Sequence, residues 1–140
     1  HRYEGYLQAL AGAGLAADPA LVTNNLSAET ETRAAVHQLL RLPAPPTAIA
    51  AASDLLAIYA MRALEDAGRR PGQDLAIVGF DDLPLAANTR PTLTTVRQPF
   101  DQICDRLIET LVGVIEGDTS VPRQSLITPE LVIRQSSITR

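Results

Sequence analysis

The feature that most constrains the fold of this chain is a pair of short apolar runs joined by an acidic loop. Residues 75–80 are apolar except for Gly79, and residues 93–96 form a second run rich in β-branched side chains. A continuous apolar run of this length is typical of a strand covered on both faces, as in a parallel sheet. Asp81 and Asp82 follow the first run at the carboxyl end of the predicted strand, and open parallel sheets bind ligands at that edge.

The rest of the sequence alternates between helical and extended patterns. Apolar spacing predicts helices over 2–13, from a cap at Ser27 to Pro43, over 54–67 and over 100–116, and extended runs at 20–24, 47–52, 124–128 and 131–134. This alternation predicts an α/β fold, a doubly wound parallel sheet with helices on both faces. Such units begin with a strand, whereas this chain opens on a helix, so we expect the sheet to lack its first strand.

The composition suits a single domain. Of 140 residues, 46% are hydrophobic, which is enough for a core without metal or disulfides. The net charge is -4 and the arginines are scattered, so any contact with DNA must come from another part of the protein. No apolar run approaches the roughly 20 residues of a membrane span. Cys104 is the single cysteine and is predicted to be a buried structural thiol, which favours a cytoplasmic protein.

Several enzyme chemistries lack the residues they need. All twelve basic residues are arginine, which removes P-loop phosphate transfer and Schiff-base catalysis, because both use lysine. The chain has two histidines and one cysteine, which gives a zinc site little support, and His37 has no G-x-S-x-G motif beside it. The segment GAGLAA has the spacing of a dinucleotide fingerprint but follows a helix. We therefore predict no catalytic residue, metal or cofactor.

The adjacent carboxylates Asp81 and Asp82 allow several interpretations. They could form an acid–base pair or hold magnesium. Adjacent residues in an extended chain point to opposite sides, which disfavours convergence on one substrate atom. We favour an arrangement in which one carboxylate accepts hydrogen bonds from a ligand and the other braces the loop. A simple acidic turn is the alternative.

Arg2 lies at the start of the first predicted helix, where the helix dipole disfavours a cation. This position suggests a functional role, such as a fork of donors aimed at a polar ligand. A solvated surface arginine is the alternative on physical grounds alone.

Longer segments carry a more specific signal than any single motif. The chain contains RYEGYLQAL, PTAIAAASDLLAIYAMRALEDAG, DLAIVGFDDLPLAANTRPTLTTVRQP and LITPELVIRQS, in that order. Together they resemble the carboxyl-terminal half of bacterial regulators of the lactose-repressor and galactose-repressor (LacI/GalR) family, over essentially the whole chain. The resemblance implies a periplasmic-binding-protein-like (type I) fold, in which two lobes are joined by three crossings and an effector lies in the cleft between them.

The resemblance also implies how the chain is divided. Residues 1–96 and 122–140 would belong largely to the carboxyl-terminal lobe. Residues 97–121 would form a crossing and a helix that packs on the amino-terminal lobe. Most of that lobe, and the helix-turn-helix head that binds DNA, are absent from this chain, so residues 1–140 would be a partial effector-binding domain.

Two close matches concern hydrogen bonding to the ligand. Asp81 matches the family's ligand-binding acid at the end of the strand. Arg2 matches the arginine of R-x-x-G, which reaches ligand hydroxyl groups. Both residues are therefore expected to bind the effector.

Four further positions would line the cleft. Phe80 and Phe100 match places where an aromatic ring can stack on the apolar face of a sugar. Ser53 stands where many members have asparagine, and Leu26 where many have an aromatic residue. Because of these two departures, no particular sugar is predicted.

The predicted function is effector binding in a transcription regulator that has no catalysis of its own. A ligand that prefers one lobe arrangement would shift that equilibrium and change how the absent heads bind DNA. The expected partners are a sugar-like effector, DNA only through the head, and a second copy of the chain near 54–67 and 84–91. The apolar face of 100–116 predicts packing on a partner or a swapped chain, and no membrane is expected. A periplasmic sugar-binding protein of a transporter is the alternative, and an enzyme using both aspartates is a third possibility.

Overall fold

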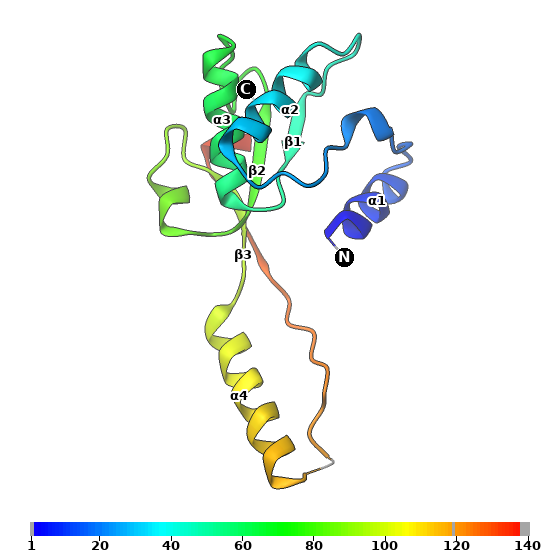
Figure 1. Cartoon of the computed structure of the whole chain (residues 1–140), viewed down its shortest axis with the longest axis vertical. Helices are drawn as coiled ribbons and strands as arrows, with labels where there is room; N and C mark the ends of the chain where they lie inside the picture. Colours follow the sequence, from blue (N-terminus) through cyan, green and yellow to red (C-terminus); the bar gives the residue numbers. More distant parts are fainter. Residues whose placement is uncertain (1, 119, 138–140) are drawn as a thin grey trace.

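The computed structural model describes residues 2–118 and 120–137. Its helices are α1 (Arg2–Gly12), α2 (Glu29–Leu40), α3 (Asp54–Asp66) and α4 (Phe100–Glu116), and its strands are β1 (Ala48–Ala50), β2 (Ala76–Asp81), β3 (Thr94–Arg97) and β4 (Glu130–Val132). Short 3-10 helices lie at Pro19–Leu21 (η1), Pro84–Ala87 (η2) and Gln135–Ser137 (η3). None of the helices in this part of the chain is long and apolar enough to cross a membrane. The elements alternate as expected for an α/β fold (Figure 1).

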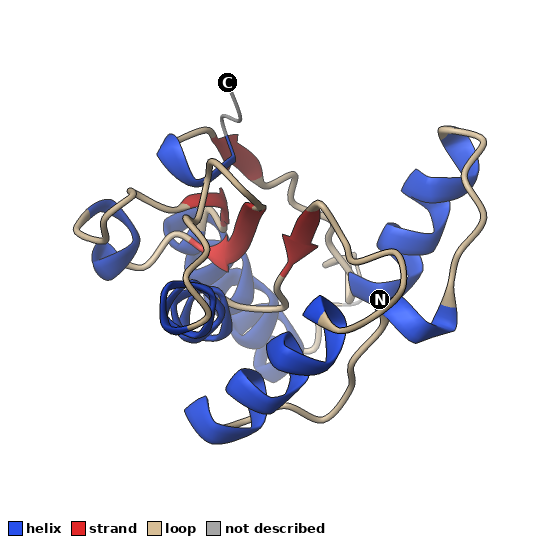
Figure 2. Ribbon diagram, turned by 90° about the horizontal axis from the view of Figure 1, so that it is seen from above, coloured by secondary structure: helices blue, strands red, loops and turns tan. Residues whose placement is uncertain are grey.

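The strands, drawn in red in Figure 2, form one sheet in the order β1-β2-β3-β4. β1 pairs with β2, and β2 with β3, in parallel, while β4 pairs with β3 in the antiparallel direction. The α/β class and the parallel core of the sheet are therefore confirmed, with an antiparallel strand added at one edge. β1 forms the other edge of the described sheet.

The core lies between the sheet and α3. Ile77 on β2 and Leu93 before β3 are fully buried against Leu64 and Ala57 of α3. Each of these apolar groups leaves water on folding, and the transfer stabilises the fold by about 25 cal/mol per Å² of buried surface. α2 packs on α3 and adds Val36 to the same cluster. The core thus fixes α3, and with it the amino end of α3, relative to β2.

The helix α4 and the segment that follows it project from the body as an arm, which we define as residues 98–118 and 120–129 (Figure 1). The return segment contacts α4 where a side chain on Gly113 would meet Val121. The large apolar side chains of α4 that stay exposed are Phe100, Leu107, Ile108, Leu111, Val112, Val114 and Ile115.

The exposure of the arm corrects one prediction. Cys104 is exposed, whereas its place in an apolar helical pattern predicted burial. The pattern does mark an apolar helix face, but no described part of this chain covers that face. The thiol is consequently open to solvent.

Two predicted extended runs do not form strands. At 20–24 the chain enters η1, because the Asp18 side chain accepts a hydrogen bond from the Ala20 N–H at 2.9 Å and Pro19 fits the first helical position. Residues 124–128 belong to the arm, where the described structure offers no strand to pair with. Strand formation needs such a partner for its backbone groups.

The cap of α2 is also displaced by one residue from the prediction. Ala28, not Ser27, is the N-cap. The Glu31 carboxylate instead accepts hydrogen bonds from the backbone N–H groups of Ser27 and Ala28, at 2.7 and 3.1 Å. These hydrogen bonds hold the pKa of Glu31 below its ordinary value.

Candidate functional site

The carboxyl end of β2 carries an unusual backbone turn. Asp81 has φ of 119° and Asp82 has φ of 54°. Positive φ is uncommon for residues with a Cβ, and such positions occur mainly where surrounding contacts hold them. The two aspartates therefore belong to a constrained turn. We call residues 81–83 the tip.

Asp54, at the start of α3, binds the backbone of the tip. Its carboxylate is fully buried and accepts a 2.7 Å hydrogen bond from the Leu83 N–H and a short one from the Thr95 hydroxyl. The Thr95 oxygen in turn accepts a hydrogen bond from the Asp82 N–H at 3.3 Å. A Cβ on Gly79 would lie 2.3 Å from Asp54 Oδ1, so only glycine leaves room for this carboxylate. The glycine in the apolar run and the aspartate of α3 thus belong to one packing unit.

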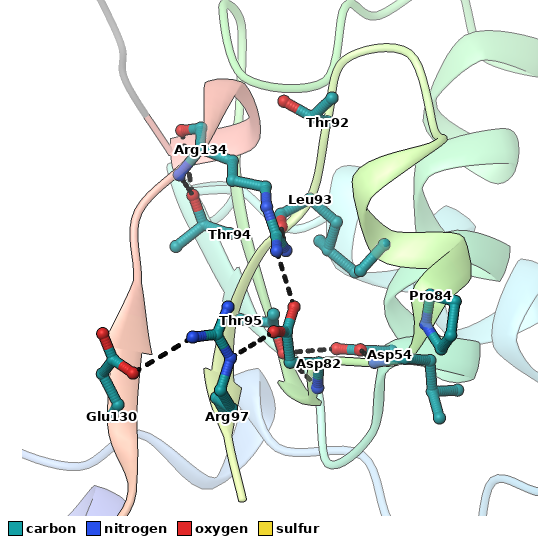
Figure 3. A network of polar contacts seen from close by, with 12 residues as sticks. Asp54, Asp82, Pro84, Thr92, Leu93, Thr94, Thr95, Arg97, Glu130 and Arg134 are labelled. Atoms are coloured by element: carbon teal, nitrogen blue, oxygen red, sulfur yellow. Dashed lines mark hydrogen bonds and ion pairs between the residues drawn. The ribbon is translucent and has the colours of Figure 1, made fainter.

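Asp82 is held by two arginines (Figure 3). Its Oδ2 accepts a hydrogen bond from Arg97 Nε at 2.6 Å and its Oδ1 accepts one from Arg134 Nη2 at 2.7 Å. Arg97 also pairs with Glu130 at 3.2 Å. Partial burial raises the pKa of Asp82, but the hydrogen bonds and charges of the two arginines outweigh burial, so the pKa lies below its ordinary value. Asp82 is therefore a brace within the protein.

Asp81 faces different partners. Its Oδ1 accepts a 2.6 Å hydrogen bond from Gln98 Nε2 and lies 3.7 Å from the guanidinium of Arg2. The Asp81 side chain is 21% exposed, and that of Arg2 is 51% exposed. The two adjacent carboxylates thus have separate partners, which is unsuitable for acid–base work on one atom. Asp81 presents an accessible acceptor beside accessible donors.

Arg2 joins α1 to this edge of the sheet. Its guanidinium lies 4.0 Å from the ring centre of Phe80 and donates a hydrogen bond to the carbonyl oxygen of Ala52. A cation over an aromatic face is attracted by the ring quadrupole. One face of the Phe80 ring is therefore covered by the Arg2 guanidinium.

The remaining candidates are more widely spread. Ser53 is the N-cap of α3, where its hydroxyl accepts a hydrogen bond from the Leu56 N–H at 3.3 Å. Phe100 begins α4 and is 50% exposed. Leu26 is half-buried in the loop before α2. Of the six predicted site residues, the structure brings Arg2, Phe80 and Asp81 into contact with one another, through the guanidinium of Arg2.

An open hollow of about 370 Å³ lies between the tip and the start of the arm. Its lining residues are Asp81, Asp82, Arg97, Gln98, Pro99, Phe100, Asp101 and Gln102. Carboxylate, amide and guanidinium groups beside the ring of Phe100 suit a polar ligand with hydroxyl groups and an apolar face. Within residues 2–118 and 120–137, no group of three or more His, Cys, Asp or Glu side chains could hold a metal ion.

Among the residues of this region that sequence reasoning missed, two had a signal in the sequence. Gln98 contacts Asp81, and its signal was its place just after the second predicted strand, beside the end of the first. Asp54 supports the tip, and its signal was an acid at a helix start in the segment before the central strand. Adjacent parallel strands end at one edge, so both residues could have been placed there.

Comparison with known proteins gives consistent matches. A family model described as a periplasmic binding protein-like domain matches residues 1–137. The HTH-type transcriptional regulator CelR of Thermobifida fusca is 35% identical over 135 residues, which cover 96% of this chain and 40% of that protein. This chain therefore spans well under half the length of that relative.

Two solved structures match closely in fold. A structure described as a transcriptional regulator CelR-cellobiose complex has a TM-score of 0.87 and 35% identity, and the match covers 96% of this chain and 41% of that one. A regulatory protein of the LacI family from Chloroflexus aggregans also has a TM-score of 0.87, with 38% identity over 96% of this chain and 49% of that one.

Proposed function

Since this chain belongs to the periplasmic-binding-protein-like domain family and, within it, to the LacI family, we propose that it is the effector-binding and dimerisation portion of a bacterial transcriptional regulator. The observation that carries the proposal is the convergence of Arg2, Phe80 and Asp81 at the carboxyl end of β2. The region acts as a binding site and has no catalytic step.

The effector class follows from the chemistry of the site. Asp81 accepts hydrogen bonds from hydroxyl groups, while Arg2 and Gln98 donate them. Phe80 and Phe100 add apolar surface on which a sugar ring can lie. A neutral sugar or a related polar metabolite satisfies all of these groups, and the complex of CelR with cellobiose gives a precedent for a sugar on this fold.

The division of the chain follows the same proposal. The body, residues 2–97 and 130–137, forms most of one lobe, and the arm provides a crossing and the helix that packs on the other lobe. Residues 122–129, which were expected in the first lobe, run along the arm instead. The exposed apolar face of α4 supports this division, because a face of that kind is stable when another surface covers it. In the full-length protein the effector lies between the lobes.

Dimerisation would use the side of the lobe that carries α3 and η2. Leu55 on α3 and Leu85 in η2 are exposed, at 43% and 50%. Leu83 beside them is 38% exposed. A symmetric pair of copies would bury these side chains together.

Regulation would work by linkage. An effector that prefers one lobe arrangement shifts the population toward it. The equilibrium constant changes at most by the ratio of the effector's affinities for the two arrangements. The dimer transmits that shift to the helix-turn-helix heads, which bind operator DNA in the cytoplasm. This chain contributes the effector contacts and the dimer surface.

A thermal-shift screen of sugars and nucleosides against the full-length protein tests the proposal. One class of ligand should raise the melting temperature and change the affinity for operator DNA. Chemical turnover of the stabilising sugar, or stabilisation with no effect on DNA binding in a protein that carries an export signal, would contradict it.

A further inference from the structure

Two chain segments connect the body to the arm, and they lie side by side. β3 leads out toward α4, and residues 120–129 lead back into β4 (Figure 1). Arg97 at the end of β3 stands opposite Glu130 at the start of β4 in the antiparallel ladder. The direction of the arm relative to the body is therefore set at this pair of strands, which we call the neck.

Asp82 joins the neck to the tip of β2. Through its two oxygens it accepts hydrogen bonds from Arg97 on β3 and from Arg134 just beyond β4. Arg134 also donates to the Leu93 carbonyl at 2.9 Å. The Asp82 side chain is only 10% exposed, so water competes little for these charge-assisted bonds. One carboxylate thus ties three segments that are distant in the sequence.

The strained backbone of the tip adds a second observation. Asp81 and Asp82 both have positive φ, a conformation that persists when surrounding contacts hold it. Asp82 accepts hydrogen bonds from Arg97 and Arg134 of the neck, whereas the adjacent Asp81 accepts one from Gln98 at the start of the arm. A change at the neck would therefore alter the direction of the Asp81 carboxylate.

The hollow beside the tip shows what this arrangement controls. Asp81 and Asp82 form one wall, and Pro99 and Phe100, at the start of the arm, form another. The distance between these walls depends on how the neck is held. Figure 3 shows the bonds from Asp82 to Arg97 and Arg134, and Asp82 and Arg97 also line the hollow.

We infer that Asp82 is a positioning residue for the effector site, whose bonds to Arg97 and Arg134 fix the neck and thereby the spacing between Asp81 and the arm. That the hollow binds an effector rests on the proposed function. The restraint that Asp82 places on the neck can be tested without it. Asp82 acts on the ligand only through Asp81 and the arm.

Hydrogen–deuterium exchange of the full-length protein, followed by mass spectrometry without ligand, tests this inference. Asp82→Asn keeps the side-chain shape and removes the charge, and Arg97→Gln removes one partner from a half-exposed position. Both variants should exchange about ten-fold faster or more in peptides covering 81–83, 94–98 and 130–134, with the buried part of α3 changed by less than about two-fold. Asp66→Asn, at the far end of α3, is the matched control and should leave all of these peptides unchanged.

The pattern of exchange distinguishes positioning from general stabilisation. Faster exchange in α3 to the same extent as in the neck would show a general loss of stability and overturn the inference, as would unchanged exchange in the neck. If Asp82→Asn fails to fold, Arg97→Gln decides by the same criteria. The readout involves no effector or DNA, so failure of the proposed function would appear separately, in the ligand screen.

Discussion

The carboxylate of Asp54 accepts a 2.7 Å hydrogen bond from the backbone N–H of Leu83, and this contact fixes the loop after β2 to the start of α3. Asp54 is 29 residues earlier in the sequence and fully buried. A buried carboxylate is costly unless it is hydrogen-bonded, and here the Leu83 amide and the Thr95 hydroxyl provide the partners. The orientation of the candidate ligand site therefore depends on a residue that does not line it.

Replacing Asp54 should destabilise the fold. In Asp54→Ala the buried Thr95 hydroxyl and the partly buried Leu83 N–H lose their acceptor, which costs on the order of 1 to 3 kcal/mol. Urea denaturation followed by circular dichroism measures this loss. Asp66→Ala removes only an exposed pair with Arg33 and should change the free energy of unfolding by about 0 to 1 kcal/mol. Equal effects of the two substitutions would contradict the role given to Asp54.

Gly79 should tolerate no larger residue while Asp54 is present. The Cβ of Gly79→Ala would lie 2.3 Å from Asp54 Oδ1, and such overpacking costs about 1 to 3 kcal/mol. Because both effects involve one space, the double variant Gly79→Ala with Asp54→Ala should lose less stability than the sum of the single variants. Strict additivity in a urea-denaturation cycle would show that the two sites are independent.

The contribution of Asp82 to stability should depend on pH. Its folded pKa lies below the ordinary value of about 3.9, so the ionised form stabilises the fold above that pH, and the contribution is lost as the pH falls through the folded pKa. In Asp82→Asn the free energy of local opening of the neck should fall by about 1.5 to 3 kcal/mol near neutral pH, and wild type and variant should converge in strong acid. Hydrogen–deuterium exchange of peptides covering 94–98 and 130–134 at several pH values, corrected for the intrinsic pH dependence of exchange, measures both curves. A gap that stays constant down to about pH 2 would contradict the assignment.

Ser53 should contribute chiefly as a helix cap. Its hydroxyl accepts the Leu56 N–H, and replacing an N-cap serine by alanine costs about 1 kcal/mol. Ser53→Ala should show this loss in thermal or urea denaturation, while Ser53→Asn should retain the cap. A larger loss in Ser53→Asn than in Ser53→Ala would mean that the position is constrained by something other than capping.

The apolar face of α4 should drive association of the 140-residue chain. Leu111 and Ile115 are 58% and 76% exposed on this face. Charged groups at these places would remain solvated in a monomer but would oppose burial at an interface. Sedimentation velocity should show oligomers of the unmodified chain and a monomer for the double variant Leu111→Glu, Ile115→Glu. A monomeric unmodified chain would contradict this prediction.

The sequence predicted local elements well where local signals suffice. The helix α4 has its predicted bounds because a wide apolar face ends at Gly117, whose positive φ terminates the helix. The extended run predicted at 124–128 does not become a strand, because pairing depends on a neighbouring strand that the local pattern cannot reveal. The prediction that Cys104 is buried is wrong for the same reason, since an apolar helix face becomes buried only when another surface covers it.

Part of the arrangement at the tip could be predicted from the sequence. The resemblance gave Arg2, Phe80 and Asp81, which the structure brings together. Spacing alone could not decide which of two adjacent aspartates is accessible, because that depends on Arg134, which is 52 residues away from Asp82. Long-range partners of this kind become visible only in the folded chain.

The most direct test of the effector site is titration calorimetry of the full-length protein with the sugar that stabilises it most in the thermal-shift screen. Asp81→Ala should weaken binding ten-fold or more, because a hydrogen bond to a charged group contributes on the order of 1.5 to 3 kcal/mol. Asp66→Ala should bind as tightly as wild type. Unchanged affinity in Asp81→Ala would contradict the account, since Asp81 would then not bind the effector.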